Sequence, residues 1–252
     1  MRLPVSTWPD IDAWLKQSTS IVIPIGSMEQ HGPNGFLGTD ALCPEIIANH
    51  AESLAPDDLL IGPTFSVGCA QHHLDFPGTI TLRPSTMIAA MVDWTDSLLR
   101  HGFDRIYWFN GHGGNIATIE AAFSEIHARR SFDPRGADTR PDLWLQSRDW
   151  WDFAEVMSLC KQIYPQGHGS HATASEVAVT YWAYPERERQ HTAMSPKIAP
   201  NGSISDAVRY RRDFPDGRIG SDPTQANAAD GGRIVAAAAQ CLIDDVARFG
   251  RH

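Results

Sequence analysis

The sequence predicts an α/β fold with a parallel central sheet covered by helices on both faces. The strands expected over 20–25 and 105–109 are apolar at consecutive positions, which is typical of strands that are buried on both faces. Segments with helical spacing of apolar residues alternate with these strands, and such alternation implies parallel pairing. In sheets of this kind a ligand binds beyond the carboxyl ends of the strands.

The expected elements follow one another without a linker or an internal repeat, so residues 1–252 are expected to form one domain. Thr39 or Asp40 is expected to cap the first of these helices, and Ser85 the second. The strands are expected over 20–25, 59–61, 105–109 and 143–145, and the helices over 39–54, 86–101, 116–130, 172–183 and 226–248. Residues 185–225 are rich in Pro, Gly and charge, which predicts a long surface excursion around one short helix.

Composition excludes two classes of partner. The formal net charge is −9 over 252 residues, and no Lys/Arg-rich stripe is present, which argues against a nucleic-acid partner. The short basic cluster over 209–212 is expected to be a solvated surface turn. No stretch is long and apolar enough to cross a bilayer, so no membrane partner is expected.

The chain is expected to reside in the cytoplasm. Its N-terminus lacks the apolar core of a signal peptide. The four cysteines are widely scattered and form no CxxC pair, which is typical of small buried side chains in a reducing compartment.

The loop after the first strand has the composition of a metal site. Glu29 and His31 follow the strand directly, and Asp40 lies at the far end of a loop rich in Gly and Pro. Carboxylate oxygens and imidazole nitrogens are ligands that suit zinc, manganese or iron(II). This segment indicates an enzyme.

A second candidate ligand follows the second strong strand. His112 is surrounded by Gly111, Gly113 and Gly114, and the missing side chains allow a metal or a substrate to approach closely. A bare Gly-rich loop could also bind phosphate at a helix N-terminus, but this one lacks a Walker lysine and a dinucleotide fingerprint. Both candidate loops leave carboxyl ends of strands, where a parallel sheet places its ligands.

His171 precedes the helix expected over 172–183, and Glu176 lies in the early turns of that helix. They are five residues apart, a spacing that does not place them on one helical face. Glu176 either faces the cleft, where it could be a metal ligand or a general base, or merely complements the helix dipole. The residues alone leave both readings open.

Together these motifs resemble the creatininase (creatinine amidohydrolase) family. The resemblance rests on Gly26–Pro33 with Asp40 downstream, on Asn110–Asn115, and on His171 followed by Glu176, all in the same order along the chain. The segment Phe76–Thr79 also resembles the substrate-side loop of the family, which would place His73 near the pocket.

The resemblance implies a three-layer α/β/α sandwich with two divalent metal ions per subunit (Zn, Mn or Fe), usually in a homohexamer. Carried over by position, Glu29 and His112 would hold one metal, His31 the other, and Asp40 would bridge them. Creatininase has a glutamate at the position of Gly114, so another carboxylate must complete the second site, and Glu176 is the natural candidate.

The implied reaction is hydrolysis of a C–N bond in a small, possibly cyclic, amide by a hydroxide that bridges the metals. Gly113 replaces the aromatic residue that contacts creatinine, so another substrate is expected. Family members with the Gly-His-Gly-Gly form include a formamide deformylase and a peptide-cleaving maturase. His171 suits protonation of the leaving nitrogen. Trp150 and Trp151 could wall the pocket or belong to the core.

Three alternatives stay open at this point. A mononuclear non-haem iron enzyme needs only two histidines and one carboxylate, which would leave carboxylates surplus. A non-catalytic metal-binding regulator would bind ligands without turnover. A structural subunit with a decayed site is the third, which the full ligand set disfavours.

Overall fold

The computed structural model describes residues 1–133, 142–188 and 193–250 and contains, within these ranges, a parallel sheet of three strands. The strands are β1 (Ser20–Ile25), β2 (Arg105–Asn110) and β3 (Trp144–Asp149), in the order β1-β2-β3. Ile25 pairs with Asn110, and Asn110 pairs with Asp149, so the three carboxyl ends lie level. The predicted parallel sheet is confirmed, and its third strand extends four residues beyond the expected end.

Helices cover both faces of the sheet, and all five predicted helices are present. The helices are α1 (Trp8–Trp14), α2 (Thr39–Leu54), α3 (Pro84–His101), α4 (Ile116–Phe132), α5 (Ala154–Ile163), α6 (Ala174–Ala183), α7 (Ala207–Asp213) and α8 (Ala228–Phe249). The expected caps were wrong. Gly38 stands at the N-cap of α2, and Arg83 stands at that of α3, because Pro84 already occupies the first helical turn.

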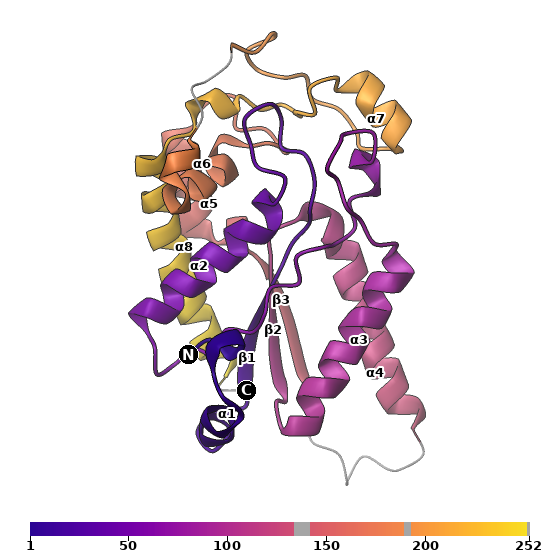
Figure 1. Cartoon of the computed structure of the whole chain (residues 1–252), viewed down its shortest axis with the longest axis vertical. Helices are drawn as coiled ribbons and strands as arrows, with labels where there is room; N and C mark the ends of the chain where they lie inside the picture. The colour runs from indigo at the N-terminus through magenta and orange to yellow at the C-terminus, as the bar shows by residue number, and fades with distance from the viewer. Residues whose placement is uncertain (134–141, 189–192, 251–252) are drawn as a thin grey trace.

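The layers of the fold follow from alternation along the strands. Ile23 and Trp108 face α3 and α4, whereas Val22 and Tyr107 face the layer of α2, α5, α6 and α8. Figure 1 shows the two helical layers on either side of the sheet. β1 and β2 are therefore buried on both faces, as their continuous apolar sequences require, whereas β3 is only partly buried. The three-layer α/β/α sandwich is confirmed.

Residues 59–61 do not form a continuous strand. Ile61 makes single parallel bridges to Val22 and to Arg2, and the Val22 amide donates to the Leu60 carbonyl at 2.9 Å. The segment thus covers the free edge of β1 without extending the sheet. Covering an edge in this way protects its unpaired backbone groups.

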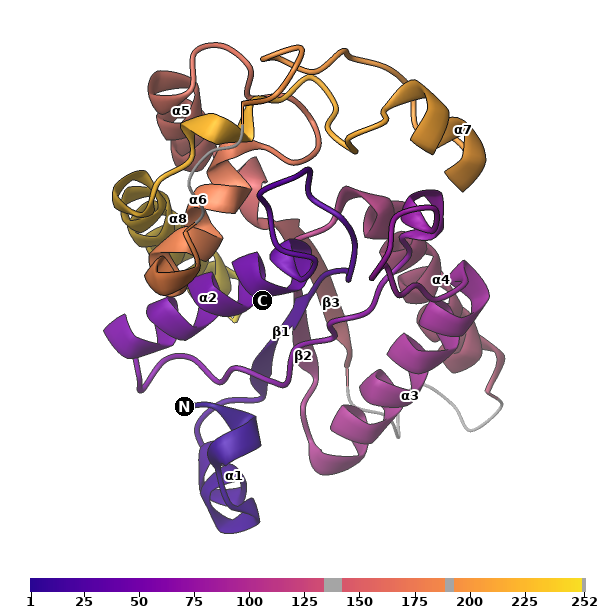
Figure 2. The ribbon, with the colours of Figure 1, turned by 45° about the horizontal axis from the view of Figure 1, so that its top comes forward.

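The segment 193–227 crosses the top of the molecule in both views, above the carboxyl ends of the strands (Figures 1 and 2). It is better anchored than the expected surface excursion. The guanidinium of Arg218 is fully buried, pairs with Asp216 at 2.8 Å and donates to the carbonyls of Pro196, Lys197 and Ser221. A buried charge needs such partners, so the segment is a fixed part of the structure where it is described. Residues 189–192 of the expected excursion lie outside the described residues.

Among the described residues, no helix has both the length and the apolar character needed to cross a membrane.

Candidate metal centre and active site

The predicted ligands meet beyond the carboxyl ends of β1 and β2. Glu29 and His31 lie in the loop after β1, Asp40 lies in the first turn of α2, and His112 follows β2. Glu176 lies in the first turn of α6. Ring and carboxylate atoms of these residues form groups of three whose atoms all lie within 4.8 Å of one another, among them Glu29–Asp40–His112 and His31–Asp40–Glu176. The sequence had placed all five in one site.

The carboxylate of Asp40 lies between two imidazoles. Its Oδ1 is 2.9 Å from Nε2 of His31, and its Oδ2 is 2.9 Å from Nδ1 of His112. The other nitrogen of each ring faces a backbone carbonyl: His31 Nδ1 lies 3.1 Å from the Glu29 oxygen, and His112 Nε2 lies 3.0 Å from the Cys69 oxygen. Because a carbonyl only accepts, a neutral ring carries its proton on that side. Each ring then points a lone pair at Asp40.

Lone pairs that face carboxylate oxygens need a cation or a proton between them. A ring nitrogen fixed by a carbonyl on its far side is the usual arrangement of histidines that bind metals. The raised pKa values of His31 and His112 indicate the same need for a cation or a proton beside Asp40. Burial would lower the pKa of His31, but Asp40 and Glu176 outweigh it and raise the pKa to about 10. For His112, Glu29 and Asp40 likewise outweigh burial and raise the pKa to about 9.

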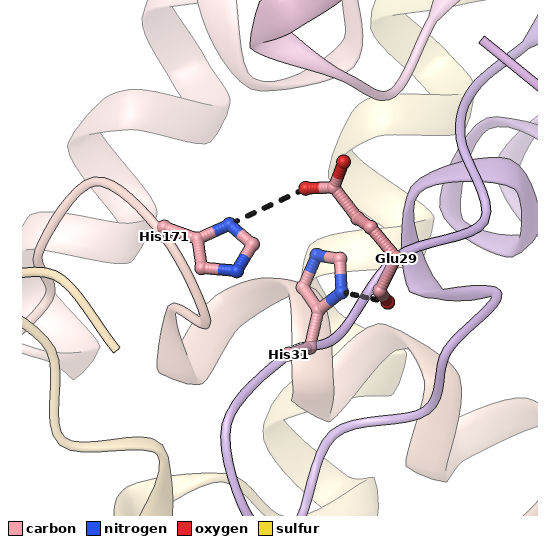
Figure 3. Close-up of side chains that lie close together, drawn as sticks. All are labelled: Glu29, His31 and His171. Carbon is pink, nitrogen blue, oxygen red and sulfur yellow. Dashed lines mark hydrogen bonds and ion pairs between the residues drawn. The ribbon is translucent and has the colours of Figure 1, made fainter. Parts of the chain in front are cut away.

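The buried carboxylate of Glu29 receives no hydrogen bond within the described part of the chain. Its side chain is fully buried, and neither carboxylate oxygen accepts a hydrogen bond from the described residues. Imidazole nitrogens of His73, His112 and His171 nevertheless approach these oxygens to 3.1, 3.3 and 3.6 Å. Figure 3 shows His171 and His31 beside Glu29, with His31 directed at the Glu29 backbone carbonyl. Burial raises the pKa of Glu29 to about 8, against the attraction of His112.

The donor set fits divalent metal ions. Both oxygens of Glu29 and Oδ2 of Asp40 are buried and accept no hydrogen bond, and a buried carboxylate is costly unless it is paired or coordinates a metal. Oxygen and imidazole nitrogen are the ligands of zinc, manganese and iron(II). Of the four groups of candidate ligands, two include Asp40 and three include Glu29.

Two glycines bring Asp40 to this position. Gly26 follows β1 and Gly111 follows β2, and a Cβ on either would stand only 2.2 or 2.0 Å from the Asp40 carbonyl oxygen. Pro44 lies four residues after Asp40 in α2 and has no amide proton to donate to that carbonyl. The start of α2 therefore packs directly on the ends of both strands.

The roles of Glu176 and Gly114 are related, because Glu176 reaches the site and position 114 has no room for a side chain. Thr173 and Glu176 form a capping box, in which each side chain accepts from the amide of the other residue. This box leaves Glu176 Oε1 3.9 Å from His31 Nε2, so the capping and cleft-facing readings are both correct. Burial raises the pKa of Glu176 to about 7. At Gly114 a Cβ would lie 2.3 Å from His112 Nε2, which leaves no room for a glutamate there.

His73 lies beside the candidate ligands. It is buried, with Nε2 3.1 Å from Glu29 Oε1 and Nδ1 2.9 Å from the Gln30 side chain. Its ring centroid lies 4.5 Å from that of His171, which lines the cavity described below. The turn over 71–73 packs against α7. His73 thus lies near the cavity, and its contact with a substrate stays a prediction.

Several polar residues of the site were missed in the sequence. The side-chain amide of Gln30 donates to the Gly217 carbonyl at 3.0 Å, and the backbone carbonyl of Gln30 lies 2.8 Å from Nε2 of His171. Asn110 donates to the His112 carbonyl at 2.7 Å, and Asn115 donates to the Gly26 carbonyl at 3.0 Å. Side-chain amides that donate hydrogen bonds to loop carbonyls leave no periodic pattern in a sequence. The asparagines on either side of the Gly-rich loop were the available cue.

A cavity of about 360 Å³ opens above the candidate ligands. Asp40, His112, His171 and Glu176 lie at its metal-site end. Gly113, Trp150 and Trp151 line it as predicted, and nothing within 4 Å would meet a Cβ on Gly113. Trp150 is 1% exposed and also belongs to the core, so both readings of this residue hold. Helix α5, absent from the predicted elements, supplies Met157, Cys160 and Lys161 to the same lining.

Comparison with known proteins agrees with this geometry. A family model described as creatininase (creatinine amidohydrolase) matches residues 5–246. The chain belongs to the creatininase family. The predicted resemblance is thereby confirmed, and since the family's characterised members are hydrolases, this creatininase-family chain is a hydrolase.

Curated relatives and solved structures span most of the chain. A mycofactocin precursor peptide peptidase of Mycobacterium tuberculosis is 29% identical over 242 residues, 92% of this chain and 86% of that protein. A creatinine amidohydrolase of Pseudomonas putida is 27% identical over 172 residues, 64% of this chain and 62% of that protein. A solved tryptophan-to-phenylalanine mutant of creatininase superposes with a TM-score of 0.83 at 20% identity, covering 99% of this chain and 98% of that one. A structure described as creatininase with manganese gives a TM-score of 0.80 at 21% identity, covering 99% of this chain and 98% of that one.

Proposed function

We propose that this protein is an amidohydrolase that depends on two divalent metal ions and cleaves a C–N bond of a small amide other than creatinine. The main observation behind this proposal is the position of the Asp40 carboxylate, which lies 2.9 Å from a ring nitrogen of His31 and 2.9 Å from one of His112. A carboxylate that faces two separate nitrogen donors is suited to bridge two ions. The Mn and Zn-Zn creatininase structures support divalent metals.

The ligands divide into two sets around Asp40. Glu29 and His112 would hold one ion, and His31 and Glu176 the other, from the groups Glu29–Asp40–His112 and His31–Asp40–Glu176. When bound, such ions supply Lewis acidity, which activates water at neutral pH and polarises a substrate carbonyl. Zinc, manganese and iron are all compatible with these oxygen and nitrogen donors.

His171 is the proposed proton carrier. Its Nε2 lies 2.8 Å from the Gln30 backbone carbonyl, which can only accept, so a neutral ring that donates there has its lone pair on Nδ1. Burial lowers the pKa of His171 well below its usual value, which keeps the ring neutral. His171 lines the cavity, where Nδ1 can take the proton of the attacking water and pass it to the leaving nitrogen.

The cavity would hold the substrate against aromatic walls. Trp150 and Trp151 lie with their rings 6.0 Å apart and nearly perpendicular, and Gly113 leaves the opposite side open. A small planar amide fits a space of about 360 Å³. Removal of water from around the reacting amide also strengthens every polar interaction in the site.

A peptide is the second candidate substrate. It is favoured by the peptide peptidase of Mycobacterium tuberculosis, whose similarity extends over 92% of this chain, whereas that to the creatinine amidohydrolase extends over 64%. We further propose, from the family resemblance, that the chain acts as one domain in a cytoplasmic homohexamer. Light scattering of the purified protein tests the oligomeric state.

Metal analysis together with a substrate screen tests the proposed reaction. The purified protein should contain about two divalent ions per chain and hydrolyse members of a panel of lactams, cyclic ureas, formamides and short peptides. One iron per chain with oxygen-dependent turnover would instead indicate the mononuclear iron enzyme. Tight ligand binding without turnover of any panel member would indicate a regulator.

A further inference from the structure

The cavity carries one cationic side chain that the proposed reaction does not use. Helix α5 presents Met157, Cys160 and Lys161 to the cavity, at positions i, i+3 and i+4, which lie on one helical face. Among the described residues, Lys161 is the one Lys or Arg residue in the lining. The other titratable lining residues are Asp40, Glu176, Cys160 and three histidines, and the two carboxylates already belong to the proposed metal site.

Lys161 also differs from the other lysines of the chain. The sequence contains three lysines, at 16, 161 and 197. Lys16 pairs with Asp12 at 2.9 Å, and Lys197 lies 3.9 Å from Asp222. Within the described part of the chain, Lys161 has no ion pair and no side-chain hydrogen bond. A positive charge at a cavity wall without an internal partner is available to a ligand.

We propose that Lys161 determines specificity by binding a carboxylate of the substrate while the amide lies at the metal site. This inference rests on the proposed function. Trp151 and Met157 supply apolar contact along the same cavity, so the lining favours an amide that also carries a carboxylate. The carboxylate could belong to a small acylated amino acid or to the C-terminus of a short peptide.

Two pairs of probes isolate the carboxylate. N-benzoylglycine and N-benzoylglycinamide share the aromatic ring and the scissile amide but differ in charge. Gly-Gly-Phe-Gly and its C-terminal amide form the peptide pair. For each pair, the ratio of kcat/KM for the acid to kcat/KM for the amide is measured with the metal-loaded full chain. Calorimetric binding of the same probes gives a second readout that does not need turnover.

Replacing the ammonium should remove the preference for the acid. In Lys161→Met we expect the ratio to fall roughly 5- to 20-fold, mainly through KM, as for loss of a charge-assisted hydrogen bond. Lys161→Arg should largely keep the ratio, and Lys16→Met, in the turn after α1, is the matched control. The affected pair, benzoylglycine or peptide, identifies the source of the carboxylate.

The two proposals fail in different ways. If Lys161→Met leaves the ratio unchanged in both hydrolysis and binding, the assignment of Lys161 is wrong, even where the wild type cleaves amides. If the wild type cleaves no probe but binds the acids in a Lys161-dependent manner, the assignment of Lys161 stands and amide hydrolysis is wrong.

Discussion

Gly111 lies directly against the Asp40 carbonyl, with room for a hydrogen atom but not for a methyl group. A Cβ at Gly111 would stand 2.0 Å from that oxygen and 2.6 Å from Cδ of Pro44. The Asp40 carboxylate, one residue into α2, depends on this contact for its place between His31 and His112. A contact between two uncharged backbone groups thus sets the geometry of the candidate metal centre.

Replacing Gly111 with alanine should therefore displace the start of α2. We expect Gly111→Ala to lower the free energy of unfolding by about 1–3 kcal/mol, as overpacking does elsewhere, and to reduce metal content. Gly113→Ala is the matched control, since nothing lies within 4 Å of its Cβ position. Chemical denaturation and metal analysis of both variants provide the test. Equal effects in the two would contradict the role given to the Gly111 contact.

Removal of the shared carboxylate should empty both metal positions. We expect Asp40→Ala to retain the fold but to bind no divalent ion, whereas Glu176→Gln should lose only the ion held with His31. The exposed Asp58→Asn serves as control. Plasma mass spectrometry counts ions per chain, and circular dichroism checks the fold. Retention of one full ion in Asp40→Ala would mean that Asp40 does not bridge.

His171 should matter for rate and not for metal binding. Its Nε2 is taken by the Gln30 carbonyl, so His171→Ala should keep both ions while kcat falls roughly 10²- to 10⁴-fold, the usual contribution of a general acid–base group. The exposed His127→Ala on α4 should leave kcat unchanged. A loss of metal in His171→Ala would identify His171 as a ligand through Nδ1.

The metal-free protein should lose stability as the pH rises above 6.5. His31 and His112 have pKa values raised to about 10 and 9, and Glu29 has one raised to about 8. The folded state therefore binds more protons than the unfolded state between pH 6.5 and 10, and stability falls across that window. The lowered pKa values of His72 and His171 act only below pH 6.5.

Thermal melts at pH 6.5, 7.5, 8.5 and 9.5 test this dependence, with chelator or with excess divalent metal. Metal binding needs deprotonated ligands, so the gain in Tm on adding metal should increase with pH. A metal-free Tm that stays constant over this range would show that the three groups do not hold the extra protons.

A buried hydroxyl far from the cavity offers a test of stability alone. Tyr107 of β2 donates to Asp245 of α8 at 2.6 Å, and Gln146 donates to the same oxygen at 3.0 Å. Tyr107→Phe should lower the free energy of unfolding by about 1–2 kcal/mol and leave kcat and metal content unchanged. Denaturant titration measures the loss. A change in metal content would show that the sheet and the site are coupled.

The sequence predicted the parts of the fold that have a periodic signal. Continuous apolar strands such as Ile21–Ile25 imply burial on both faces, and from this the layers and the position of Glu29 and His112 follow. Helix α5 is not among the predicted elements, although Val156, Cys160 and Ile163 recur at helical spacing, because a helix of 10 residues gives only a short periodic pattern. The exact place of His73 depended on how the turn over 71–73 packs on α7, and contacts between distant segments have no local signature.

Helix α5 contributes none of the candidate metal ligands found among the described residues, yet three of its side chains line the cavity. The candidate metal ligands and the residues proposed to select the substrate thus lie on separate elements of the fold. Substitutions at Met157 or Lys161 can alter which molecules enter without disturbing the cations. A change of substrate is consequently open to this scaffold through one short surface helix.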